Sequence, residues 1–209
     1  MPEFLNHWLY EFVTLLVILD PIATVPLFMA AAAGLNPQKS ARLAFYALGI
    51  AFGILVFFIA FGQHLLEALK IPMASFQLAG SIIFLILGLQ MATGRMDGHA
   101  PEIESDKHIL SRAVFPLATP GIAGSGAILT VVLLTDNYSR TVQEQITTVS
   151  VLLACLSLHL LAFLLSGPLF RWLGNSGIQI ISRVFGLILT SIAVNGMIVA
   201  IKQSFGLGS

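Results

Sequence analysis

Long runs without a charged side chain most constrain what this chain can fold into. Five such runs cover 43–62, 73–94, 113–135, 145–170 and 184–201. Each approaches or exceeds the roughly 18 apolar residues that a helix needs to cross a bilayer. A sixth candidate, 8–30, contains Glu11 and Asp20. We predict an all-α membrane protein with six transmembrane helices in the lipid bilayer, because a membrane β-barrel would show alternating segments of about ten residues.

Composition agrees with a chain that lies in lipid. Hydrophobic residues make up 57% of the 209 residues and charged residues only 10%, whereas soluble domains carry about 25% charged residues. Ten basic and ten acidic residues leave no net charge, which argues against a nucleic-acid partner. The single cysteine, Cys155, excludes an internal disulfide. Neither a cofactor motif nor a metal-ligand cluster occurs within the spans, and no basic leader indicates a signal peptide.

Lys and Arg in the short loops orient the spans, since these residues are enriched in cytoplasmic loops. The loops after the first, third and fifth spans carry seven basic residues, and the opposite side carries three. We therefore expect the odd-numbered loops in the cytoplasm and both termini outside, at the periplasmic face of the inner (plasma) membrane if the host is a bacterium. The seven are Lys39, Arg42, Arg95, Lys107, Arg112, Arg171 and Arg183, and the three are Lys70, Arg140 and Lys202.

The first span is interrupted by the stretch VILDPIATVPLF at 17–28. Pro21 and Pro26 have no N–H to donate, so they leave the carbonyls of Val17 and Ile22 without helical partners. Asp20 adds an ionisable side chain near the middle of the span, at a cost of about 2.5–3.5 kcal/mol on insertion scales. Broken backbone persists at membrane depth only beside protein or a wet cavity. We therefore predict a helix break from Asp20 to Pro26 that lines a cavity, with Asp20 also able to cap the helix that restarts.

A similar break is predicted in the fourth span, FPLATPGIAGSGAIL at 115–129. Pro21 and Pro120 lie 99 residues apart, near half the chain length. The third spans also resemble each other, SIIFLILGLQM matching GLILTSIAVNG. Three spans per half would insert the halves in opposite directions, as in transporters built from inverted repeats. The predicted organisation is two inverted three-helix repeats, 1–94 and 113–209, joined by a cytoplasmic linker at 95–112.

These patterns nominate one polar site where the two breaks meet near the midplane. Its predicted residues carry polar groups or open the backbone, and Gln90 and Asn195 join them because amides are costly in lipid and should face the bundle interior. The set is Asp20, Pro21, Thr24, Pro26, Gln90, Thr119, Pro120, Gly121, Gly124, Ser125, Gly126 and Asn195. Thr24, Thr119 and Ser125 have a second interpretation, because Ser and Thr commonly satisfy freed carbonyls in broken helices.

The chain resembles the MarC family of six-helix bacterial inner-membrane proteins, which are grouped with the LysE-type transporters. The stretches ILDPIATVPLF and FPLATPGIAGSGAI carry the resemblance, together with FQLAGSIIFLILGLQM and GIQIISRVFGLIL. The chain departs from the family pattern at Ser125, where the pattern has proline, and at Ala23 and Thr24, where it has Gly-Asn. Relatives carry Asn in place of Asp20. The resemblance implies a transporter of neutral amino acids.

Two classes of function are compatible with the sequence. The first is a secondary transporter or exporter of a small polar solute, most simply a neutral amino acid, with a proton or sodium ion as coupling ion and a homo-oligomer as an open alternative. The second is an intramembrane serine hydrolase that would use Ser125 and His159. A serine within a helix break is better explained by backbone satisfaction, so we expect a protein that is not an enzyme.

Three further features are expected to be structural. Glu11 should lie near the outer headgroups, about two and a half turns before Asp20. A lone histidine within a span, His159, is more often a satisfied packing residue than a proton relay. The GxxxG pattern formed by Gly49 and Gly53 should let helices of one chain pack closely.

Overall fold

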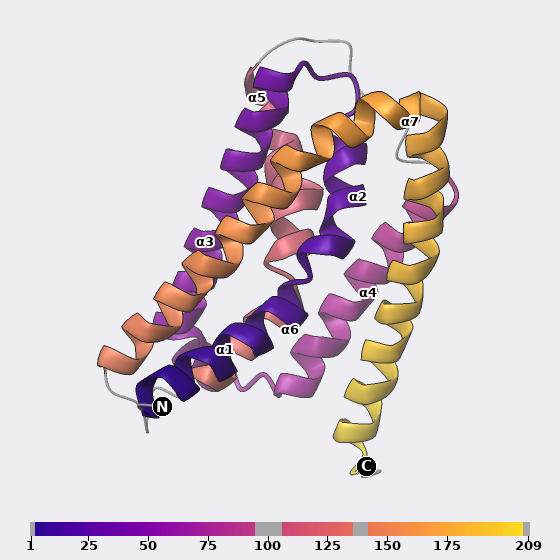
Figure 1. Cartoon of the computed structure of the whole chain (residues 1–209). Coiled ribbons are helices and arrows are strands. Elements are labelled where there is room, and N and C mark those ends of the chain that lie inside the picture. The colour runs from indigo at the N-terminus through magenta and orange to yellow at the C-terminus, as the bar shows by residue number, and fades with distance from the viewer. Residues whose placement is uncertain (1–2, 95–105, 136–141, 207–209) are drawn as a thin grey trace.

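The computed structural model describes residues 3–94, 106–135 and 142–206, which form a bundle of helices (Figure 1). No strand occurs among these described residues, in agreement with the predicted all-α class. The helices in chain order are α1 (Glu3–Leu19), α2 (Pro21–Ala31), α3 (Pro37–Ala68), α4 (Met73–Ala92), α5 (Asp106–Arg112), the π-helical segment η2 (Ala113–Ile122), α6 (Ser125–Leu134) and α7 (Val142–Ser204).

Five of the described helical segments are long and apolar enough to cross a membrane, and six if the bent pair formed by Ile109–Ile122 and Ser125–Leu134 counts as one span. The six match the six spans predicted from the sequence. The last two are continuous in α7, which turns over one end of the bundle between Gln143–Gly167 and Gln179–Ser204 (Figure 1). The prediction of several membrane-spanning helices is therefore confirmed, while the join between the last two spans is helical.

The first and last described residues lie at one end of the bundle, and α5, the α2–α3 turn and the bend of α7 lie at the other (Figure 1). A chain that crosses the bundle an even number of times starts and finishes at the same end of it. Of the predicted linker at 95–112, residues 106–112 form α5, and residues 95–105 lie outside the described part. The assignment of either end to the cytoplasm stays a prediction.

The core lies where α3, η2 and α6 pack with α1, α2 and the first part of α7. Leucine and alanine on one face of α3, such as Leu43, Ala47 and Leu55, are fully buried, whereas aromatic residues on its other face are exposed. In a bilayer an exposed apolar side chain is in contact with lipid, so this pattern needs no further partner. The GxxxG prediction is wrong for packing within the chain, because a Cβ added to Gly49 or Gly53 would meet nothing within 4 Å.

The two third spans pack closely against each other. A Cβ on Gly186 would lie 2.4 Å from the backbone nitrogen of Ala92, and one on Gly88 would lie 2.7 Å from that of Thr190. A Cβ on Gly196 would meet Ser81 Oγ at 2.5 Å. The helices are antiparallel, since the contacts move forward along α4 and backward along α7. The symmetry of the halves stays a prediction.

Candidate functional site

The first break consists of one residue. Asp20 has φ 43° and ψ 76°, which lies in the left-handed region, and it separates α1 from α2. Asp and Asn adopt this conformation more readily than other non-glycine residues. The Asp20 carboxylate accepts a hydrogen bond from the Ala23 N–H at 3.0 Å, so Asp20 is the N-cap of α2. Pro21 occupies the first position of α2, where its missing N–H costs nothing.

The predicted extent of this break is wrong, because α2 continues through Pro26 to Ala31. A proline inside a helix removes one hydrogen bond, and here the surrounding helix is retained. Thr24 is buried and donates through Oγ1 to the carbonyls of Asp20 at 3.3 Å and Pro21 at 3.1 Å. Thr24 therefore bonds to backbone carbonyls beside the break, although that of Asp20 also accepts from the Thr24 N–H, and its role in a substrate site stays a prediction.

His159 of α7 lies directly against the first break. Its Nε2 is 3.2 Å from the Leu19 carbonyl oxygen and its Nδ1 is 3.0 Å from that of Cys155. Ala23 would ordinarily donate to Leu19 in a continuous helix, but its N–H is bonded to Asp20 instead. His159 therefore supplies a partner for a carbonyl that the break leaves open. It is fully buried, and the neutral ring can donate to only one of the two carbonyls, so the choice between a packing residue and a proton relay stays a prediction.

The hydrolase alternative finds no support in this geometry. A general base needs a ring nitrogen directed at the nucleophile, whereas both nitrogens of His159 face backbone carbonyls. Ser125, the first residue of α6, is buried against α4, where a Cβ added to Gly80 would collide with its Oγ.

The second break is longer and contains little polar chemistry. The segments Ile109–Ile122 and Ser125–Leu134 are bent by 57°. Within η2, Phe115 and Thr119 have extended backbone, and each precedes a cis proline. The turn is closed by the Ala123 N–H, which donates to the Ala118 carbonyl at 2.8 Å. The prediction that the fourth span is broken is therefore confirmed.

Two glycines allow the backbone of the second break to pack closely. A Cβ on Gly121 would lie 2.7 Å from Leu27 Cδ2 and 2.8 Å from the Pro116 carbonyl oxygen. A Cβ on Gly124 would lie 2.6 Å from Phe84 Cε2 and 2.7 Å from the Pro120 carbonyl oxygen. No side chain fits at either position without movement of backbone, so these glycines hold η2 and α6 against α2 and α4.

The two breaks border one cleft of about 240 Å³. Asp20 and Thr24 line it from the first break, and Gly121 lines it from the second. Gly126 lies beside it, with its Cβ position 3.9 Å from Ile18 Cγ2. The remaining walls are apolar and come from α1, α2, α4 and the last part of α7: Val17, Ile18, Leu19, Ala23, Leu27, Phe84, Met91, Phe185, Ile188, Leu189 and Ile192. The cleft is therefore an apolar chamber with one acidic group at its edge.

Several residues nominated from the sequence lie elsewhere. Gln90 and Asn195 are exposed, so the expectation that they face the interior is wrong. The reason is that α4 and α7 turn their glycines towards each other and direct these amides outwards. Thr119 is exposed as well, and Pro26, Pro120, Gly124 and Ser125 are buried in packing that does not line the cleft. Pro21 is half-buried at the start of α2.

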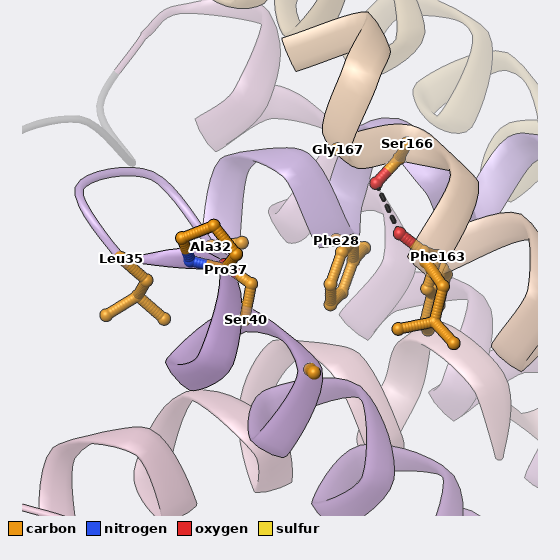
Figure 2. Close-up of a pocket in the computed structure, with 10 residues that line it drawn as sticks. Phe28, Ala32, Leu35, Pro37, Ser40, Phe163, Ser166 and Gly167 are labelled. Carbon is orange, nitrogen blue, oxygen red and sulfur yellow. Dashed lines mark hydrogen bonds between the residues drawn. The ribbon is translucent and has the colours of Figure 1, made fainter. Parts of the chain in front are cut away.

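A second cavity of about 580 Å³ lies between α2, the start of α3 and α7 (Figure 2). Phe28 and Phe163 line it and are stacked, with ring centroids 4.3 Å apart and planes 5° apart. Phe163 also contacts His159 edge-on at 6.2 Å. The stacked pair thus lies between this cavity and the His159–Leu19 contact. The sequence does not predict this stacked pair, because single aromatic residues in apolar spans carry no distinguishing signal.

Comparison with known proteins adds a family to this geometry. The sequence model described as MarC family integral membrane protein matches residues 5–205. The chain belongs to the MarC family. The family assignment made from the two proline motifs is thereby confirmed, and the chain is an integral, multi-pass membrane protein.

Relatives cover nearly the whole MarC chain. A UPF0056 membrane protein of Methanocaldococcus jannaschii is 30% identical over 200 residues, covering 95% of this chain and 97% of the relative. One of Aquifex aeolicus is 29% identical over 206 residues, covering 97% and 96%. The UPF0056 membrane protein YvbG of Bacillus subtilis is 28% identical over 201 residues, covering 94% of each. No solved structure matches the chain.

One acidic side chain of this MarC protein is buried against α7. Glu11 is fully buried and accepts a hydrogen bond from Thr148 Oγ1 at 2.9 Å. Its expected depth near the outer headgroups stays a prediction, and nothing in the sequence indicated its burial on the face of α1 that packs on α7. Among the described residues, no group of three His, Cys, Asp or Glu side chains could hold a metal ion.

Proposed function

We propose that this MarC protein is a secondary transporter that moves a small neutral amino acid by alternating access around the cleft at Asp20. The observation that carries the proposal is the shared cleft, since both helix breaks border it and it holds an acid within an apolar span. Transporters built from broken helices bind substrate where the breaks meet. An intramembrane ionisable residue is a functional-site candidate by default.

The chemistry of the cleft suits an amino acid with an apolar side chain. The Asp20 carboxylate and the backbone carbonyls beside it offer acceptors to an ammonium group. The N-terminus of α6 begins at Ser125 beside Gly126, and helix N-termini favour carboxylates. Ile188, Leu189 and Ile192 form an apolar wall. A volume of about 240 Å³ lies below the usual range of drug-sized pockets, about 300–1,000 Å³, which favours a small solute.

The larger cavity is the proposed route to the linker side, which the distribution of basic residues assigns to the cytoplasm. It opens near the α2–α3 turn and ends at Phe28 and Phe163 (Figure 2). We assign this stacked pair to the closed barrier between the route and the first break. The two termini would then lie at the periplasmic face of a bacterial inner membrane. The coupling ion is a proton or sodium, and a homo-oligomer is compatible with the exposed Gly49 and Gly53.

Uptake of a labelled neutral amino-acid panel by proteoliposomes tests the proposal. Wild-type protein should show saturable uptake of at least one amino acid with an apolar side chain. Asp20→Ala should lower uptake about tenfold or more, because a hydrogen bond to a charged group contributes about 1.5–3 kcal/mol. Asp20→Asn keeps a capping oxygen, so it separates loss of charge from loss of the cap.

Ile22→Ala is the matched control, since Ile22 follows the break but is 77% exposed and outside the cleft. It should transport like the wild type. Unchanged uptake by Asp20→Ala, or no uptake of any solute by wild-type protein, would show that the cleft is not a transport site.

A further inference from the structure

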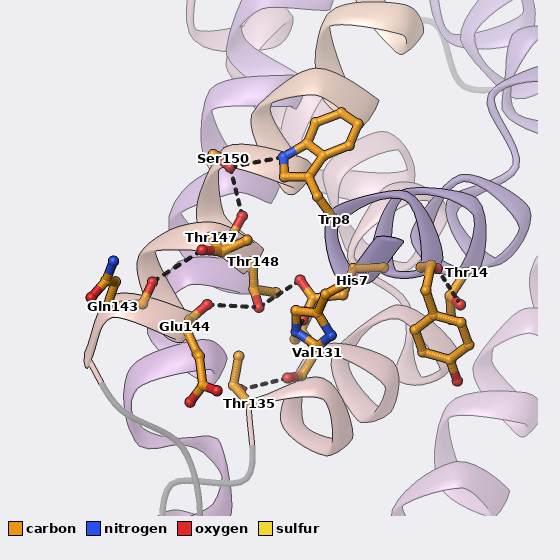
Figure 3. A network of polar contacts seen from close by, with 12 residues as sticks. His7, Trp8, Thr14, Val131, Thr135, Gln143, Glu144, Thr147, Thr148 and Ser150 are labelled. Atoms are coloured by element: carbon orange, nitrogen blue, oxygen red, sulfur yellow. Dashed lines mark hydrogen bonds and ion pairs between the residues drawn. The ribbon is translucent and has the colours of Figure 1, made fainter. Parts of the chain in front are cut away.

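We propose that Glu11, His7 and Thr148 form a proton-binding site that couples transport to a proton gradient. This inference rests on the proposed transport function but concerns a different site, at the end of the bundle that holds the termini. Figure 3 shows it between α1 and the first turns of α7. The two helix breaks do not explain why an acid is buried at the position of Glu11.

Burial and bonding single out Glu11 from the other acids of the described residues. Its side chain is 0% exposed. His7 Nε2 lies 3.0 Å from one carboxylate oxygen, Oε1, and Thr148 Oγ1 donates to the other, Oε2, at 2.9 Å. A buried carboxylate in an apolar span is expensive unless hydrogen bonds compensate, and a simple clamp between helices would not need one.

The position of His7 gives the site access to water. Its side chain is 36% exposed, whereas that of Glu11 is fully buried. In a neutral His7 with its proton on Nε2, water delivers a proton to Nδ1 while the Nε2 proton passes to Oε1 of Glu11. This leaves a neutral imidazole with its proton on Nδ1 and a neutral carboxylic acid, so the net reaction is the uptake of one proton. Hard metal cations prefer shells of oxygen ligands, and the imidazole nitrogen on Oε1 therefore favours a proton over sodium.

Contacts along α1 connect this site to the substrate cleft. Side-chain hydrogen bonds along the described length of α1 join it to α7: Trp8 Nε1 to Ser150 Oγ at 3.2 Å, Thr148 to Glu11, Cys155 Sγ to the Phe12 carbonyl at 3.8 Å, and His159 to the Leu19 carbonyl. The helix is unbroken between Glu11 and Leu19, a distance of about 12 Å at 1.5 Å per residue. One end of this rigid segment binds the proton, and the other ends at Asp20.

Neutralising Glu11 would weaken the attachment of α1 to α7. The ionised carboxylate makes charge-assisted bonds, which are roughly twice as strong as neutral ones. A protonated Glu11 no longer accepts the bond from His7 Nε2, and it loses the charge that strengthens the bond from Thr148. The outer end of α1 is then free to move relative to α7, while His159 keeps its inner end in place. Proton binding thus favours a state with the cleft open towards the termini.

Among the described residues, the titratable side chains beside this cluster include His7 on α1 and Glu144, which lies in the first turn of α7, one turn before Thr148. Figure 3 shows the Glu144 carboxylate pointing away from Thr148. The remaining packed element, α6, contains no charged side chain.

Two transport modes of the full-length protein in proteoliposomes test the inference. Glu11→Gln mimics the protonated state, so it should lose accumulation driven by an imposed proton gradient by about tenfold or more, within the range of coupling between two sites. It should keep counterflow exchange, which needs no gradient, near the wild-type rate. Glu144→Gln is the matched control, an acid-to-amide change at the same end, and should keep both modes.

Each other outcome overturns a distinct statement. Normal proton-driven accumulation by Glu11→Gln would remove Glu11 from coupling. Loss of both modes together with lowered thermal stability would make Glu11 a structural residue. Accumulation driven by a sodium gradient alone in the wild type would show that the coupling ion is not a proton. Absence of counterflow in the wild type would instead contradict the proposed transport function.

Discussion

At the first break a single residue, Asp20, separates α1 from α2, whereas at the second break the backbone needs several residues to turn from η2 into α6. The first break is held by polar groups: the Asp20 cap, the Thr24 hydroxyl and the His159 ring. The second is held by close packing of Gly121 and Gly124 against backbone and side chains. The two breaks differ in how they are stabilised.

This difference separates two tasks that a transport site must combine. Polar groups at the first break place an acid and carbonyl oxygens beside the cleft, where they can contact a solute. Close packing at the second break gives a rigid wall with few polar side chains. We therefore expect substitutions at the second break to affect folding first, and substitutions at the first break to affect transport first.

Gly124→Val should produce the largest loss of folded protein, because the second break is held by close packing. Its side chain would collide with Phe84 and with the Pro120 carbonyl oxygen, and overpacking costs about 1–3 kcal/mol, occasionally more. We expect little monodisperse protein after size-exclusion chromatography in detergent. Gly126→Ala is the control in the same break, because its Cβ would lie 3.9 Å from the nearest atom, Ile18 Cγ2. Well-folded Gly124→Val would show that the second break is not held by packing.

The sequence predicted the spans and both breaks because these depend on local chemistry. Uncharged runs mark the helices, and a proline interrupts the hydrogen-bond ladder wherever it occurs. The sequence misplaced Gln90 and Asn195 because the face that a membrane helix turns inwards is set by small residues on its neighbours. It also assigned Pro26 to the break, whereas the residue that leaves the helical conformation is Asp20, the N-cap before Pro21.

His159→Leu should lower thermal stability by an intermediate amount. The substitution tests whether His159 stabilises the first break. In the tautomer with its proton on Nε2, His159 donates to the Leu19 carbonyl. Leucine would fill the space but leave that carbonyl without a donor, at a cost of about 1–3 kcal/mol. Thermal unfolding in detergent should show a lowered midpoint. His159→Gln retains an N–H donor and should recover part of the loss, and equal midpoints for the two variants would contradict a role in satisfying Leu19.

Partners from distant parts of the chain explain the rest of what the sequence could not predict. His159 and Glu11 each acquire their importance from a residue more than a hundred positions away, Leu19 and Thr148 respectively. One chain provides no signal for such pairs. The apolar walls of the cleft, such as Phe84 and Ile188, are likewise indistinguishable in sequence from residues that face lipid.

Pro26→Ala should have the smallest effect. The new N–H can donate to the Ile22 carbonyl, a gain of about 1 kcal/mol, and the loss of the rigid proline ring offsets a similar amount through the unfolded state. We expect a nearly unchanged unfolding midpoint and retained transport in the same assays. A large loss of transport with normal folding would mean that the first break extends functionally as far as Pro26.

The close approach of α4 to the last part of α7 has a consequence for biosynthesis. Gly88 and Gly186 belong to opposite halves of the chain, so the ribosome completes α4 long before its partner exists. Until the final helix inserts, the glycine face of α4 contacts lipid and the cleft lacks the wall formed by Ile188, Leu189 and Ile192. The nascent protein therefore gains the complete walls of the cleft only in the last stage of translation. A quality-control protease that recognises unpaired membrane helices would cleave the chain before that stage.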